Sequence, residues 1–112
     1  MKLTTINKWI LFTIIFVGAM FRLYNVDWDQ GYHLHPDERA IVSTADSLAF
    51  PKTITEFFSP ESPLNTHFFA YGNLPFYLVK LAGQSLSAFD PNFAHYALLN
   101  IPGRFISAIS DL

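Results

Sequence analysis

Cysteine is absent from the 112-residue chain, which excludes disulfide bonds and thiolate metal sites. Charged residues are scarce as well: they make up 14% of the sequence, whereas a globular protein has about 25%. The net charge is −2, so there is no basic field to hold nucleic acid. Hydrophobic residues account for 51% of the chain, and twelve of them are phenylalanine. Because so little polar surface is available to cover a core, a bilayer or a larger body of protein must surround much of the chain.

An uncharged apolar run occupies residues 9–21. It is shorter than the roughly 20 residues that cross a bilayer, but Arg22 can extend its guanidinium to the lipid headgroups and lengthen the span. We therefore expect residues 1–24 to form a first transmembrane helix. The alternative is a cleaved signal peptide in which Lys2 and Lys8 form the basic region.

The charges are distributed unevenly on the two sides of this run. Lys2 and Lys8 precede it, whereas residues 27–61 contain seven acidic and two basic residues. Because the orientation of a membrane protein follows its Lys/Arg bias, the pattern predicts a cytoplasmic N-terminus and an extracytoplasmic first loop. We expect an integral protein of the plasma (cell) membrane.

The external loop is expected to cover residues 25–72 and to contain one short amphipathic helix, at about residues 36–50. Proline suits the first turn of a helix, as at Pro36, and Pro51 would end it. Apolar residues recur at the spacing of one buried helix face, at Ile41, Ala45, Leu48 and Ala49.

Two further apolar segments follow the loop. Residues 73–89 are expected to form a second transmembrane helix, with a polar stripe that must face protein or a water-filled cavity. Residues 97–112 are expected to begin a third. The predicted fold class is therefore all-α and integral to the membrane, and we expect this chain to be the N-terminal fragment of a polytopic helical bundle.

Residues 27–39 are the densest polar cluster and lie just beyond the first predicted span. At about 100° per residue, Asp37 is expected in line with the buried face of the loop helix, with Glu38 at the edge of that face. A buried carboxylate is costly without a partner or a function, and the helix N-terminus keeps it ionised. Asp37 could then act as a general base. The alternative interpretation is that Asp37 and Glu38 only cap the helix.

Other polar residues of the loop have weaker functional interpretations. His33, His35 and Asp37 alternate, so an extended segment would project all three to one side, where they could hold a divalent metal. Hydrogen bonding of the histidines to the acidic residues is the alternative. Asp29 is the second-choice base, or else a solvated turn residue.

The sequence HLHPDERAI, following an apolar helix that ends in RLYN, resembles the first external loop of the C-type glycosyltransferase superfamily. The nearest relatives suggested by the resemblance are protein O-mannosyltransferases and lipid A aminoarabinose transferases. Residues 67–77 resemble the family's entry into its second span, and residues 103–108 resemble the opening of its third. Together these segments cover most of the chain in the family's order.

The resemblance implies a multi-spanning enzyme that transfers a sugar, with inversion, from a polyprenyl or dolichyl phosphate to a hydroxyl acceptor. By the same resemblance Asp37 is the base and Glu38 its neighbour. Aminoarabinose-transferase-like relatives have a lysine before the second span that meets the lipid phosphate, whereas this chain has Asn73-Leu74-Pro75 there. Lys80 is a substitute, or else a lysine that extends to the headgroups. Asp29 and His35 are further candidate substrate contacts.

The full-length parent is thus expected to be an enzyme that binds membrane lipid and a lipid-linked sugar, and the isolated fragment to be inactive. The sequence requires no cofactor, although a divalent metal at His33 and His35 is left open. The expected topology also leaves open on which side of the bilayer Arg104 lies. Two other functions remain: a small membrane-anchored interaction protein that binds a partner through its loop, and a secreted metal-dependent hydrolase.

Overall fold

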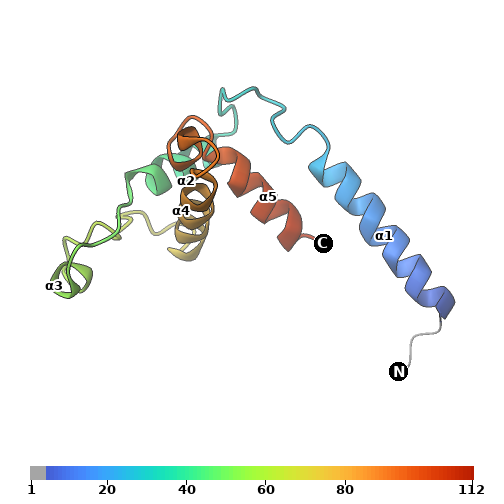
Figure 1. Cartoon of the computed structure of the whole chain (residues 1–112), viewed down its shortest axis with the longest axis horizontal. Helices are drawn as coiled ribbons and strands as arrows, with labels where there is room; N and C mark the ends of the chain where they lie inside the picture. Colours follow the sequence, from blue (N-terminus) through green and yellow to red (C-terminus); the bar gives the residue numbers. More distant parts are fainter. Residues whose placement is uncertain (1–4) are drawn as a thin grey trace.

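The computed structural model describes residues 5–112, and in these residues every regular element is helical. Figure 1 shows a long first helix set beside a cluster of shorter ones. In chain order the elements are α1 (Thr5–Leu23), α2 (Pro36–Ser47), α3 (Ile54–Phe57), α4 (Leu74–Leu86), the 3-10 helix η1 (Pro91–Ala94) and α5 (Asn100–Ser110). The prediction of an all-α chain is confirmed for this part of the sequence.

Helix α1 has 19 residues and none of them is buried. Its mean hydropathy is 1.6, and it is the helix among residues 5–112 that is long and apolar enough to cross a membrane. A signal sequence near an N-terminus has the same properties. Helix α1 contacts α5, where Arg22 lies 3.8 Å from the Asp111 carboxylate. Lys2, on which part of the predicted orientation depends, lies outside the described residues.

Helices α2, α4 and α5 pack against one another and form the core. The buried cluster consists of Val42, Ala45, Val79 and Leu99, with Ile41 and Ile106 packed against it. The members on α2 are three or four residues apart, which places them on one helix face. This packing fixes α2, and with it the acidic residues of its first turn, against the start of α5.

Gly83 allows η1 to approach α4 closely. A Cβ at this position would clash with the backbone carbonyl of Phe93 and with the side chain of Leu99. The backbone of Phe93 cannot move away as a flexible side chain would, so only glycine fits without a shift of η1. The close approach sets the path of the chain into α5.

The segment between α2 and α4 is held by local hydrogen bonds. Thr53 caps α3 by accepting from the backbone N–H of Glu56, and the Glu56 carboxylate accepts in turn from the Lys52 N–H at 2.6 Å. The arrangement is close to a capping box, except that Glu56 accepts from the residue before the N-cap instead of from the N-cap itself. The Tyr77 hydroxyl donates to the Leu64 carbonyl at 2.9 Å and ties the segment to α4.

The helix boundaries differ from the expected ones at several ends. The loop helix ends at Ser47 rather than near residue 50, because Leu48 already has an extended backbone with ψ of 142°. Helix α4 covers 13 residues rather than the whole of 73–89. At 1.5 Å per residue its length is about 20 Å. The helix expected from residue 97 begins at Asn100. Second and third membrane crossings therefore stay predictions.

Candidate functional site

A groove of about 530 Å³ lies between the start of α2, α4 and α5. We call it the Asp37 groove. Its apolar lining includes Ile41, Leu78 and Ile106, and its polar lining includes Asp37, Glu38 and Arg104. His35, Ser107 and Ser110 also line it. A concave, mostly apolar site with a few convergent polar groups is the usual form of a small-molecule site.

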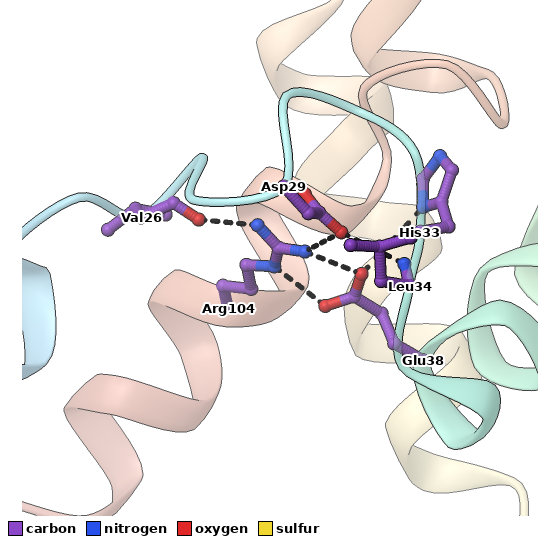
Figure 2. Close-up of polar contacts among 6 residues, drawn as sticks. All are labelled: Val26, Asp29, His33, Leu34, Glu38 and Arg104. Carbon is purple, nitrogen blue, oxygen red and sulfur yellow. Dashed lines mark hydrogen bonds and ion pairs between the residues drawn. The ribbon is translucent and has the colours of Figure 1, made fainter.

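Arg104 organises the polar end of this groove, as Figure 2 shows. Its Nε donates to Glu38 Oε2 at 2.6 Å, and its Nη2 donates to Glu38 Oε1 at 2.7 Å, so the pair is bidentate. Nη2 also donates to Asp29 Oδ2 at 2.7 Å, and Nη1 donates to the Val26 carbonyl at 2.6 Å. One guanidinium thus joins the loop after α1, the first turn of α2 and the first half of α5.

The geometry of these contacts is that of a buried ion-pair network. The Arg104 side chain is 13% exposed, the Glu38 side chain 20% and the Asp29 side chain 0%. The guanidinium carbon lies 5.4 Å from the centre of the Trp28 ring, within the range of a cation–π contact. Two carboxylates around one guanidinium leave this end of the groove with a net negative charge.

Asp29 is the buried member of the network. Its hydrogen bond from Arg104 lowers the pKa of the carboxyl below its ordinary value, against the opposing effect of burial. The backbone N–H of Leu34 adds a second hydrogen bond at 3.1 Å. Because Asp29 is 4% exposed and engaged with Arg104, it is poorly placed to accept a proton from an incoming hydroxyl.

Asp37 lies at the rim of the groove and is exposed. Its predicted position on the buried face of α2 is wrong. The face that packs on α4 and α5 contains Val42 and Ala45, with Glu38 directed to Arg104, and this face is about a quarter turn away from Asp37. The exposed position leaves the Asp37 carboxylate open to the groove.

Tyr71, from the segment before α4, is a partner of Asp37. The Asp37 carboxylate raises the pKa of the tyrosine hydroxyl above its ordinary value, as a hydrogen-bond acceptor and through its negative charge. The hydroxyl therefore holds its proton more tightly than a free tyrosine does. Tyr71 was not singled out by sequence reasoning, since it is 34 residues from Asp37 and belongs to a different segment.

The two histidines diverge instead of projecting to one side. His33 adopts a left-handed backbone with φ of 48°, is 3% exposed, and packs against Tyr96 with ring centres 4.4 Å apart and ring planes tilted by 47°. Its Nδ1 lies 3.7 Å from Glu38 Oε1. His35, by contrast, is exposed at the N-cap of α2. Among residues 5–112 no three His, Asp or Glu side chains are grouped so as to hold a metal ion, and the metal site stays a prediction.

Lys80 lies away from the Asp37 groove. Its Nζ donates to the Asp46 carbonyl at 3.1 Å, and its side chain lines a separate cavity between α4 and the segment after α2. Of the candidate site residues, Asp37, Glu38 and His35 line the groove, Asp29 supports it through Arg104, and Lys80 does not join them.

Comparison of the chain with protein-family models, with curated proteins and with solved structures gave no match.

Proposed function

We propose that the chain is the N-terminal part of a membrane glycosyltransferase that moves a sugar from a polyprenyl or dolichyl phosphate to a hydroxyl acceptor with inversion. The observation that carries the proposal is the position of Asp37: an exposed carboxylate at the rim of an apolar groove, next to a buried carboxylate–guanidinium network. The resemblance of HLHPDERAI and of two later segments to the C-type superfamily supports the same assignment.

The placement in a plasma membrane is part of this proposal. Helix α1 would cross the bilayer with its N-terminus in the cytoplasm, and the segment up to α4 would lie on the outer side, against the membrane surface. Helices α4 and α5 would belong to a larger bundle, in which neighbouring helices cover the apolar side chains that are exposed here, such as Leu78, Phe105 and Ile109. The apolar wall of the groove suits a lipid-linked donor.

The proposed reaction begins with a proton transfer. The Asp37 carboxylate takes the proton of the acceptor hydroxyl, and the hydroxyl oxygen forms a bond to the anomeric carbon. The bond from that carbon to the phosphate oxygen breaks on the opposite face, and the phosphate leaves with the electron pair. Attack and departure on opposite faces invert the anomeric centre. Tyr71, whose hydroxyl pKa is raised by Asp37, would help to hold the carboxylate in position.

The Arg104 network has a positioning role in this scheme. It anchors Glu38, and therefore the first turn of α2, against α5. Asp37 is the preceding residue of the same turn, so its carboxylate is set by a fixed backbone rather than by a flexible loop. Because its donors are already committed to Glu38, Asp29 and Val26, Arg104 is a poor candidate for binding the leaving phosphate.

The test is Asp37→Asn in the full-length parent, reconstituted in liposomes and assayed for transfer from a lipid-linked sugar. Loss of a general base costs about 10²- to 10⁴-fold in rate, and we expect a loss in this range at normal expression. The matched control is Asp27→Asn, since Asp27 is an exposed aspartate of the same loop that does not line the groove. Near-normal transfer by Asp37→Asn would reassign the base.

One observation favours a second function, that of a membrane-anchored interaction protein. The segment around α3 exposes several large apolar side chains: Phe50, Ile54, Phe57, Phe58 and Phe69. Clustered exposed apolar residues mark interaction surfaces. Under this alternative Asp37 is a helix-capping residue only, and Asp37→Asn leaves function intact while Phe57→Ser and Phe58→Ser remove it. The reading frame beyond Leu112 also separates the two, because further apolar spans support the enzyme.

A further inference from the structure

A second cavity, of about 650 Å³, lies between α4 and the segment that connects α2 to α4. We call it the Lys80 cavity. Its apolar lining is Leu48, Ala49, Phe50, Phe57, Leu64, Phe69 and Leu81, and its polar lining is Ser59, Ser62, Asn65, Asn73, Tyr77 and Lys80. The cavity and the Asp37 groove border different faces of α4. Tyr77, Lys80 and Leu81 line the cavity, whereas Leu74, Leu78 and Val79 line the groove.

Most polar groups of the Lys80 cavity are already engaged within the chain. The Tyr77 hydroxyl donates to the Leu64 carbonyl, the Asn73 side-chain oxygen accepts from Thr66 at 2.8 Å, and the Ser62 hydroxyl accepts from the Leu64 N–H. These contacts hold the wall in shape and leave it chemically apolar. Size and character fit a ligand with a hydrocarbon chain.

Lys80 is the charged group of this lining, and no carboxylate accompanies it there. Within residues 5–112 its Nζ makes no ion pair, and its recorded hydrogen bond goes to the neutral carbonyl of Asp46. An ammonium has three donors, so donors remain for a ligand. A half-buried cation without a carboxylate partner favours an anionic group beside it.

We infer that the Lys80 cavity binds an anionic membrane phospholipid, with an acyl chain along the phenylalanine wall and the headgroup phosphate at Lys80. Charge complementarity selects the headgroup. Several wall side chains are half exposed or more, among them Phe57 at 51%, Phe69 at 69% and Leu81 at 50%, and an acyl chain would remove this surface from water. The inference goes beyond the proposed transfer reaction, and it rests on the placement of α1 in a membrane with α4 and the segment before it at the membrane surface.

The experiment uses the full-length protein in nanodiscs that contain phosphatidylglycerol with a photoreactive diazirine in its acyl chain. A phosphatidylcholine probe with the same acyl chain is the zwitterionic comparison. After illumination, peptides are mapped by mass spectrometry. We expect phosphatidylglycerol to label residues 48–58 and 73–81 in preference to phosphatidylcholine, by about fivefold, the factor that one lysine contributes near an anionic membrane surface.

Three variants make the test specific. Lys80→Gln should reduce the preference to about one, and Lys80→Arg should retain it. Lys52→Gln is the matched control, because Lys52 is an exposed lysine of the same segment that does not line the cavity. Equal labelling by both probes, or an unchanged preference in Lys80→Gln, would overturn the inference.

A competition arm identifies the source of the phosphate. Unlabelled phosphatidylglycerol should displace the probe, whereas phosphatidylcholine at the same mole fraction should not. Displacement by a polyprenyl phosphate alone would assign the cavity to the sugar donor and overturn the inference. Labelling should persist in Asp37→Asn, so a failure of the lipid site and a failure of the proposed reaction give different results.

Discussion

The Asp37 groove and the Lys80 cavity lie on two faces of α4 and differ in how their charges are balanced. In the groove one guanidinium is held by two carboxylates and a carbonyl, so its donors are committed and the surrounding backbone is fixed. In the cavity one ammonium has no carboxylate partner among residues 5–112, and the wall around it is mostly apolar. Arg104, whose guanidinium nitrogens all donate hydrogen bonds within the chain, suits the positioning of another group. Lys80, which has donors to spare, suits the binding of an anion.

The largest effect on stability is expected for Arg104→Gln, which leaves the buried Asp29 and the partly buried Glu38 without their counter-ion. Removal of one partner of a buried ion pair costs about 3–5 kcal/mol. Chemical unfolding in detergent, followed by circular dichroism, measures the free energy of unfolding. The control is Arg39→Gln on the exposed side of α2, for which we expect a change within about 0.5 kcal/mol. Equal losses of unfolding free energy in the two variants would show that the Arg104 ion pairs stabilise the fold no more than an exposed arginine does.

Gly83→Ala should destabilise the packing of η1 and Leu99 against α4, the helix that borders both the Asp37 groove and the Lys80 cavity. The added methyl group meets the backbone of Phe93, so η1 must shift, and overpacking of this kind costs about 1–3 kcal/mol. The same unfolding measurement applies. Gly72→Ala is a less suitable control because its φ is 70°, whereas Ser85→Ala tests an exposed position of the same helix. An unchanged midpoint in Gly83→Ala would show that η1 tolerates displacement.

Acid should weaken the ion-pair network at the polar end of the Asp37 groove. The pKa of Asp29 is lower in the folded chain than its ordinary value of 3.8, so Asp29 contributes stability above pH 3.8 and loses that contribution as the pH falls through the lower folded-state pKa. Unfolding curves recorded between pH 7 and pH 2 measure this loss. In Asp29→Asn the part of the pH dependence that is due to Asp29 should vanish, and an unaltered acid slope would contradict the network.

The smallest effect is expected for Tyr71→Phe, which removes the hydroxyl that interacts with Asp37 and keeps the ring. Loss of one partly exposed hydrogen bond should lower the transfer rate by less than about tenfold. Transfer assays on the full-length parent measure it, with Tyr24→Phe as a control at an exposed tyrosine next to the end of α1. A rate above wild type would mean that Tyr71 restrains the base rather than positions it.

Local sequence signals predicted the elements well. The prolines at residues 36 and 51, with apolar residues at helical spacing between them, indicated a loop helix, and α2 begins at Pro36. The apolar run near the N-terminus indicated a long helix, and α1 covers it. These signals succeed because capping and periodicity act within a few residues of each other.

The site itself depends on contacts that no local pattern contains. Arg104 is 66 residues from Glu38 and 75 from Asp29, so periodicity could not bring them together. Because Glu38 points to Arg104, the face of α2 that packs on α4 and α5 contains Glu38, Val42 and Ala45, and Asp37 lies outside this face. The one available signal was the presence of an arginine inside an apolar segment, since such a residue needs a partner.

The most direct measurement separates donor binding from turnover in Asp37→Asn of the full-length parent. Donor affinity comes from titration with a fluorescent lipid-linked sugar, and the rate comes from single-turnover transfer. If Asp37 is the base, the affinity stays within a few-fold of wild type and the rate falls by about 10²-fold or more. A loss of affinity with an unchanged rate of transfer at saturation would contradict the account, because it would make Asp37 a binding residue only.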